Sequence, residues 1–241
     1  DPRDLHSFPT RRSSDLSTEV MADLKTVDGL IGEFLEELDR LGIRQASTVA
    51  VVSEYSLSDV SGAVCPNILL RDAGLLKVRE IEGLEYLDFE MSRAFAMVDH
   101  QVAHVYVREG ATRAVAELLK GAEGIDMVLN PEEQKPYHVN HPRSGELVAV
   151  TTPDRWFAYY WWTNPEKAPD FAHTVDIHRK PGYDPLELFL NPQKTGISTD
   201  TTLIKGSHGA PSDGRQRKAA FLLSGDDAGR LALKPEVDMV E

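Results

Sequence analysis

The sequence contains little cysteine and no long apolar run, and both shortages exclude classes of protein. Cys65 is the single cysteine in 241 residues, so the chain can form neither an internal disulfide nor a zinc site that needs several cysteines. A membrane-spanning helix needs roughly 18 apolar residues, and the richest apolar window covers only residues 156–162. We therefore expect no membrane association.

Positive charge is also scarce. The chain carries 26 Lys and Arg residues against 39 Asp and Glu residues, which gives a formal net charge of −13. A protein that binds nucleic acid without sequence preference needs a basic face, so we expect no nucleic-acid partner. An acidic protein can still bind phosphate esters when metal cations supply the positive charge locally.

Several catalytic and nucleotide-binding motifs are absent. The sequence has no GxxxxGK[ST] and no GxGxxG pattern, which argues against the common phosphate-binding loops. It also has no HExxH and no GxSxG, the patterns typical of zinc metalloproteases and of serine hydrolases. The composition, 41% hydrophobic and 27% charged, is that of a folded globular protein.

Residues 1–16 differ from the rest of the chain. They show neither helical nor strand periodicity, and their three acidic and three arginine residues cancel in charge. They lack the apolar region of a signal peptide, and since no such peptide is visible we expect a cytoplasmic protein. We interpret the segment as the translation of a sequencing adapter, with a disordered natural tail as the alternative. Native sequence upstream of Ser17 would then be missing.

Residues 17–241 alternate helix and strand patterns, which predicts an α/β fold with a mainly parallel central sheet flanked by helices. Residues 17–41 form an amphipathic helix pattern, and the apolar run 48–52 is typical of a parallel strand buried on both faces. We expect a small inserted α+β subdomain at 92–162. The other expected elements are a helix at 66–73, a hairpin at 75–89, a strand at 94–107, a helix at 111–120, strands at 124–129, 145–150 and 156–162, a buried strand at 219–224, and an irregular connection at 163–202.

Two single residues are the first candidates for a metal site. Glu54 follows the apolar run 48–52, at the strand end where ligands bind in open α/β sheets. A capping carboxylate is an equally good interpretation. His208 lies between Gly206 and Gly209 in a turn, and imidazole is a common zinc ligand. The alternative is a surface histidine.

Two pairs of residues are weaker candidates. His100 and His104 would share one face of the strand 94–107 and could chelate a metal, although partly buried histidines satisfied by their neighbours are the favoured alternative. Asp176 and His178 alternate to one side of an extended stretch, where a structural loop is favoured. The aromatic run 156–162 could stack on a base or a sugar, but core packing is the preferred interpretation.

Taken in order, these pieces resemble the alkaline phosphatase superfamily, in particular its type I phosphodiesterase/nucleotide pyrophosphatase branch. The resemblance covers most of residues 17–225. The features that carry it are the helix 17–41, the strand 48–52 with Ser53-Glu54-Tyr55, the stretch Ser92–Val107, and the blocks His141–Glu146, Asp176–Asp184 and Lys205–Gly209.

The resemblance implies two metal ions, usually zinc, at the carboxyl ends of the sheet strands, with a Thr or Ser nucleophile between them. The late Gly-x-His-Gly ligand of the family maps onto His208. The Ser-Asp-His-Gly motif falls on residues 53–56, where Glu54 can still ligate but Tyr55 is a poor replacement for histidine.

The altered motif implies that one metal site is altered, or that another residue, such as His100, Asp176 or His178, fills the gap. The family's nucleophile, its early Asp and its Asp-x-x-x-His motif would lie upstream of the helix 17–41. We therefore expect a fragment that holds no catalytic residue of its own.

These observations predict the C-terminal portion of a metal-dependent hydrolase of phosphate esters, foremost a phosphodiesterase or nucleotide pyrophosphatase. Its cofactor would be a divalent metal, zinc, with two ions in the full-length enzyme, and its substrate a small-molecule phosphate ester or nucleotide. The alternatives are a phosphomonoesterase, sulfatase-like hydrolase or metal-dependent mutase of the same superfamily, and a non-catalytic relative that has lost a metal. We expect the fragment by itself to be inactive.

Overall fold

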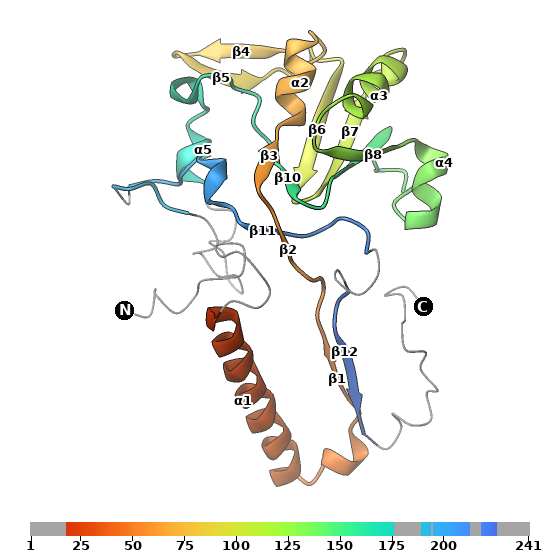
Figure 1. Cartoon of the computed structure of the whole chain (residues 1–241), viewed down its shortest axis with the longest axis vertical. Coiled ribbons are helices and arrows are strands. Elements are labelled where there is room, and N and C mark those ends of the chain that lie inside the picture. Colours follow the sequence, from red (N-terminus) through yellow and green to blue (C-terminus); the bar gives the residue numbers. More distant parts are fainter. Residues whose placement is uncertain (1–17, 176–188, 194, 213–217, 226–241) are drawn as a thin grey trace. The chain divides into compact units, whose positions relative to one another are not determined.

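The computed structural model describes residues 18–175, 189–193, 195–212 and 218–225 (Figure 1). These residues form two compact units, which we describe separately. The larger unit comprises 57–212, and the smaller one comprises 18–56 together with 218–225. The expected non-native segment 1–16 lies outside the described residues.

The smaller unit contains one long helix and one pair of strands. Helix α1 (Thr18–Arg40) and the short 3-10 helix η3 (Arg44–Ala46) precede strand β1 (Val49–Val52), which pairs antiparallel with β12 (Phe221–Ser224). The predicted helix 17–41 and a strand within 219–224 are thereby confirmed. The prediction that the latter strand is buried is wrong, because Phe221 and Leu222 are 43% and 64% exposed.

Strand β1 differs from its prediction. It was expected to be parallel and buried on both faces, but it pairs antiparallel with β12 and alternates between half-buried and exposed residues, with Val52 54% exposed. An apolar run of this length predicts a strand but not its partner or its direction. The partner of β1 lies about 170 positions further along the chain, so local sequence does not reveal the pairing.

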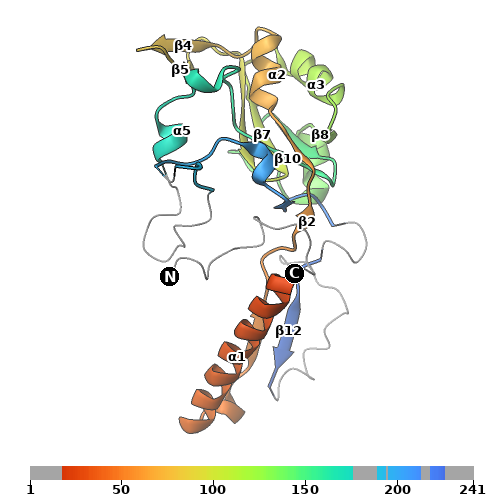
Figure 2. The ribbon, with the colours of Figure 1, turned by 60° about the vertical axis from the view of Figure 1, so that its left-hand side comes forward.

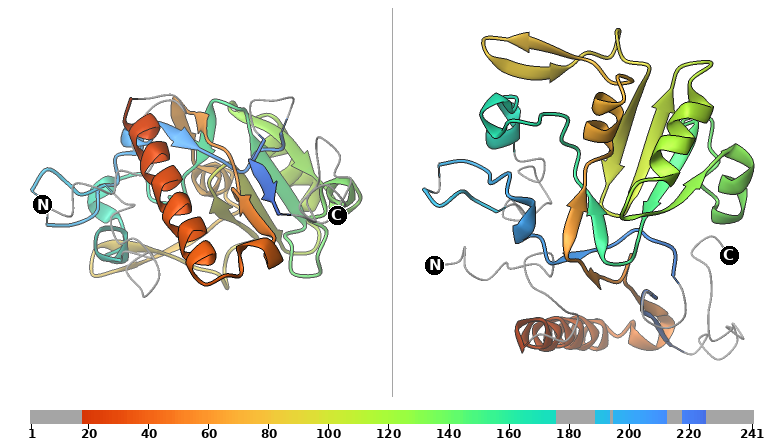
Figure 3. Two further views of the ribbon diagram at one scale, coloured as in Figure 1. Left: turned by 90° about the horizontal axis from the view of Figure 1, so that it is seen from below. Right: turned by 45° about the horizontal axis from the view of Figure 1, so that its top comes forward.

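The larger unit is built on a four-stranded sheet in the order β6-β7-β9-β8 (Figure 3). Its strands are β6 (Ala94–Asp99), β7 (Val102–Val107), β8 (Ile125–Leu129) and β9 (Leu147–Thr151), and every neighbouring pair is antiparallel. All five residues of β9 are buried, as expected for a strand with a neighbour on each side.

Two helices pack on this sheet and on each other (Figure 2). Helix α2 (Pro66–Asp72) begins with a proline, which is favoured in the first turn, and contacts β6. Helix α3 (Thr112–Lys120) contacts β8 and β9 and places Val115 and Leu119, four residues apart, into the core. Leu70, Leu76 and Val105 are buried in the same core.

Shorter elements surround the sheet and position the site. Strand β3 (Gly62–Val64) pairs parallel with β10 (Arg155–Phe157), β2 (Ser58–Asp59) pairs antiparallel with β11 (Gly206–Ser207), and β4 (Val78–Ile81) forms a hairpin with β5 (Leu84–Leu87). The remaining elements are α4 (Pro131–Gln134), η4 (Lys135–Tyr137), η5 (Pro165–Lys167), α5 (Phe171–Thr174) and η6 (Thr201–Leu203).

The α/β class is therefore right, but the mainly parallel sheet is wrong for the described residues, in which β3–β10 is the one parallel pair. Neighbouring strands along the chain pair locally as hairpins, which alternating helix and strand patterns do not reveal. The helices at 66–73 and 111–120 and the hairpin at 75–89 are confirmed. The inserted subdomain 92–162 stays a prediction.

Two predicted strands need correction. Residues 94–107 are not one strand but the hairpin β6–β7, and in 156–162 the strand ends at Phe157. The aromatic run nevertheless supplies core residues, because Phe157, Trp161 and Trp162 are buried. Of the described helices, none is long and apolar enough to cross a membrane.

Candidate functional site

The candidate site begins at the tight turn between β6 and β7. Asp99 pairs with Val102, which leaves His100 and Gln101 as the turn residues. His100 has a φ of 54°, a left-handed conformation that is uncommon outside glycine but is adopted more often by histidine than by most residues. This turn removes the His100 side chain from the pleat of the sheet, so the predicted shared strand face with His104 does not exist.

Residues 206–209 dock on this turn; the sequence predicts a turn here, but Gly206 and Ser207 form strand β11. The backbone N–H of Gln101 donates to the carbonyl oxygen of His208 at 2.9 Å, and the N–H of Ala210 donates to Oε1 of Gln101 at 3.3 Å. Gly209 has a φ of 109°, and a Cβ added there would lie 3.4 Å from the Gln101 nitrogen. Gly209 therefore supplies a backbone conformation that other residues rarely adopt.

Gln101 joins the β6–β7 turn to the segment that carries His208, and it was not among the residues predicted from the sequence. Its side chain is fully buried, and its Nε2 donates to the carbonyl oxygens of Pro153 and Arg155 at 3.1 and 3.0 Å. A buried amide whose donors and acceptor all have partners holds its surroundings in one arrangement. A polar residue that follows a histidine in a predicted strand carries no sequence signal for this role.

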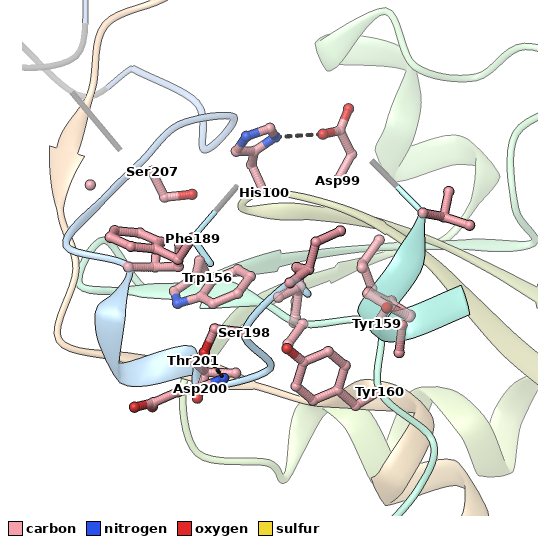
Figure 4. Close-up of a pocket in the computed structure, with 18 of the residues that line it drawn as sticks. Asp99, His100, Trp156, Tyr159, Tyr160, Phe189, Ser198, Asp200, Thr201 and Ser207 are labelled. Atoms are coloured by element: carbon pink, nitrogen blue, oxygen red, sulfur yellow. Dashed lines mark hydrogen bonds and ion pairs between the residues drawn. The ribbon is translucent and has the colours of Figure 1, made fainter. Parts of the chain in front are cut away.

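This docking brings His100 and His208 into contact. Their rings stack with centroids 3.8 Å apart and planes at 29°. Nδ1 of His100 lies 2.5 Å from Oδ1 of Asp99, as the dashed line in Figure 4 shows. Two histidines separated by more than 100 positions in the sequence thus share one site with a carboxylate.

Burial and charge set the protonation of these groups. Burial, followed by the proximity of His100, lowers the pKa of His208 to about 4, while Asp99 opposes that shift. The hydrogen bond with His100 lowers the pKa of the Asp99 carboxyl below its usual range. His208 is therefore neutral near pH 7 and carries the ring lone pair that a metal ligand needs.

The donor types at this site suit a divalent transition metal, because imidazole and carboxylate are ordinary zinc ligands. Their number is too small for a complete site: within the described ranges, no group of three or more His, Cys, Asp or Glu side chains is placed to hold a metal. The rings of His100 and His208 also lie face to face, whereas two ligands of one metal direct their nitrogens to a common point.

None of the other predicted ligands is described as part of the stacked pair. His104 lies on β7, and its Nδ1 accepts from the backbone N–H of Gly145 at 3.2 Å. Burial lowers the pKa of His104. Glu54 follows β1 in the smaller unit. Asp176 and His178 lie outside the described residues.

A cavity of about 340 Å³ adjoins the turn at His100. In Figure 4, Asp99 and His100 lie at one end, Trp156 and Phe189 in the middle, and Tyr160 and Asp200 at the other end. Most of its exposed lining is apolar, and its volume is within the range of small-molecule sites. Trp156, Tyr159 and Tyr160 come from the aromatic run whose preferred interpretation was core packing.

The fold and the site define a mixed α/β protein with a histidine pair beside a cavity of small-molecule size. The chain belongs to the type I phosphodiesterase/nucleotide pyrophosphatase family, which matches residues 3–184. This confirms the resemblance drawn from the sequence. The match includes Asp99 and His100, and His208 follows it. No curated protein matches the chain.

Solved structures of two kinds are similar to the chain. Murine ectonucleotide pyrophosphatase/phosphodiesterase 5 is 20% identical with a TM-score of 0.42, over 60% of this chain and 35% of that one. Phosphonoacetate hydrolase from Sinorhizobium meliloti, in complex with phosphonoacetate, is 18% identical with a TM-score of 0.42, over 62% of this chain and 36% of that one. The chain thus spans about a third of their length.

Proposed function

We propose that this chain is part of a metal-dependent hydrolase of phosphate esters, foremost a phosphodiesterase or nucleotide pyrophosphatase. The observation that carries the proposal is the family match over residues 3–184. One further feature supports it: the net charge of −13 leaves a phosphate ester without electrostatic attraction unless cations are bound.

In this proposal His208 and Glu54 are metal ligands, and His100, Asp176 and His178 are further candidates. The ions, zinc in our proposal, would supply positive charge to the phosphoryl oxygens and to the attacking and leaving groups. Asp99 has a positioning role, because its hydrogen bond to Nδ1 fixes the ring of His100 and leaves Nε2 as the atom available to a ligand.

The buried Gln101 is a positioning residue as well, because its hydrogen bonds join the segment that carries His208 to the turn that carries His100. No residue of this chain is assigned as the nucleophile. We also propose that residues 17–241 are a truncated alkaline-phosphatase-like domain that is inactive alone. Residues 92–162 would form its inserted subdomain.

The test is metal binding followed by activity. The full chain is titrated with zinc in a calorimeter, and the gene product extended upstream is assayed on a chromogenic phosphodiester with zinc or manganese. We expect His208→Ala to weaken zinc binding at least tenfold and to abolish hydrolysis by the extended protein. The exposed histidine at position 138, changed to alanine, is the matched control and should alter neither.

Two results would contradict the proposal. One is an extended protein without hydrolysis above background in the presence of any divalent metal. The other is equal zinc affinity in the chain with and without His208. If the extended protein binds no metal at all, the non-catalytic relative becomes the better interpretation. Tyr55 in the place of a histidine favours that second candidate.

A further inference from the structure

The cavity beside His100 contains polar atoms whose hydrogen-bonding capacity is unused. Nε1 of Trp156 and Oγ of Ser207 are buried, and neither has a hydrogen-bond partner among the described residues. Ser207 is only 1% exposed. Both residues line the cavity. A buried polar group without a partner costs roughly 1–3 kcal/mol, so two of them at one cavity point to a ligand that supplies the missing partners.

The chemistry of these two atoms restricts that ligand. The indole N–H of Trp156 can only donate, and the hydroxyl of Ser207 can donate or accept. A ligand that satisfies both must therefore present at least one acceptor, such as a carbonyl or ether oxygen.

Three other polar side chains of the lining already have hydrogen-bond partners. The hydroxyl of Tyr160 donates to the carbonyl oxygen of Thr199 at 3.1 Å, and the hydroxyl of Ser198 accepts from the N–H of Asp200 at 3.2 Å. Oδ1 of Asp200 accepts from the N–H and the hydroxyl of Thr202 at 2.9 and 2.7 Å. Because most of the exposed lining is apolar, a nucleobase, which presents several donors and acceptors along its edge, would leave most of them without partners here.

The walls of the cavity are aromatic. Trp156, Phe189 and Tyr160 present large side chains to it, as Figure 4 shows, and Phe171 and Tyr159 also belong to its lining. Aromatic side chains bind flat rings by stacking and edge contacts. Burial raises the pKa of both Tyr159 and Tyr160, so their phenol groups stay neutral at physiological pH.

We propose that this cavity binds a flat, mostly apolar ring system that carries an acceptor atom, in preference to a nucleobase. The acceptor would receive hydrogen bonds from Trp156 and Ser207, and the ring would lie against the aromatic wall. Because the cavity adjoins His100, the ring is assigned as the organic group of the ester, and this assignment rests on the proposed function.

Binding is measured with three probes that carry no phosphate, so the result is independent of hydrolysis and of metal. Coumarin is flat and apolar and has a carbonyl acceptor, naphthalene has a similar shape without an acceptor, and adenosine carries a nucleobase. We expect coumarin to bind the full chain at least fivefold more tightly than naphthalene, because one buried hydrogen bond contributes about 1 kcal/mol. Adenosine should bind more weakly than coumarin.

Two variants locate the site. Trp156→Phe keeps an aromatic ring but removes the donor, and Ser207→Ala removes the hydroxyl, so each should reduce the preference for coumarin over naphthalene by about fivefold or more. Tyr137→Phe removes a hydroxyl at an exposed position of the same unit and should change nothing. Circular dichroism and thermal unfolding identify any variant that fails to fold. In that case, the relative affinities of the three probes for the unchanged chain test the proposal.

Tighter binding of adenosine than of coumarin, equal binding of coumarin and naphthalene, or no binding of any probe would overturn the proposal. None of these results bears on whether the extended protein hydrolyses phosphate esters. Conversely, an extended protein without hydrolytic activity whose cavity still prefers coumarin would remove the ester assignment and leave the binding site intact.

Discussion

Helices α1 and α3 are both amphipathic, yet their apolar residues have opposite surroundings. In the larger unit, Val115 and Leu119 of α3 are 0% exposed and belong to a continuous core. In the smaller unit, Leu30 and Phe34 of α1 are 58% and 53% exposed. The same sequence period therefore produced a buried face in one unit and an exposed face in the other.

The comparison shows what an amphipathic pattern can predict. A period of 3.6 residues predicts a helix with an apolar side, but the burial of that side depends on which sheet or helix packs against it. Helix α3 contacts β8, β9 and α2, so its apolar residues contribute to stability. We expect the free energy of unfolding to respond to substitutions in the larger unit far more than to substitutions in α1.

The largest effect is expected from Leu119→Ala. This removes a fully buried side chain from the core and leaves a cavity, which should lower the free energy of unfolding by about 2–5 kcal/mol. The three tryptophans, at positions 156, 161 and 162, all lie in the larger unit. Urea unfolding followed by tryptophan fluorescence therefore reports on this unit. A loss below roughly 0.5 kcal/mol, the range of ordinary surface changes, would mean that the core is not packed as described.

A smaller effect is expected from the ion pair that joins α2 to the β4–β5 hairpin. Nη2 of Arg71 donates to Oε1 of Glu85 at 2.9 Å, and Glu85 is only 7% exposed. Glu85→Gln should lower the free energy of unfolding by about 2–3 kcal/mol, below the usual range for breaking a buried pair because the Arg71 side chain keeps 23% exposure. Glu80→Gln, which breaks the exposed pair with Lys167, is the matched control and should cost under about 1 kcal/mol.

The same pair predicts a dependence on pH. The hydrogen bond from Arg71 lowers the pKa of Glu85 in the folded protein. The pair therefore contributes its full stability above the unfolded pKa of about 4.3, and this contribution is lost as the pH falls through the lower folded value. Urea unfolding between about pH 5 and pH 3 should show a shallower decline in Glu85→Gln than in the unchanged chain. Equal slopes would show that other carboxylates dominate acid unfolding.

The sequence predicted the secondary-structure elements better than it predicted the site. Long periodic segments were predicted correctly, such as the helix 111–120, because periodicity is a local property. The strand 94–107 was wrong, because nothing in Asp99-His100-Gln101 marks a two-residue turn: it contains neither glycine nor asparagine, the usual residues there. The contact of His100 with His208 was beyond prediction for the same reason, since it depends on that turn and on the buried Gln101.

The smallest effect is expected from Leu30→Ala in α1, the counterpart of Leu119→Ala. Its side chain is already 58% exposed, so truncation removes little buried surface and should change the free energy of unfolding by less than about 0.5 kcal/mol. Alanine also has the higher intrinsic helix propensity, so the helix itself should not weaken. Far-UV circular dichroism during urea unfolding reports on α1, which contains no tryptophan. A loss as large as that of Leu119→Ala would mean that the apolar face of α1 is packed in solution, and the contrast between the two helices would then disappear.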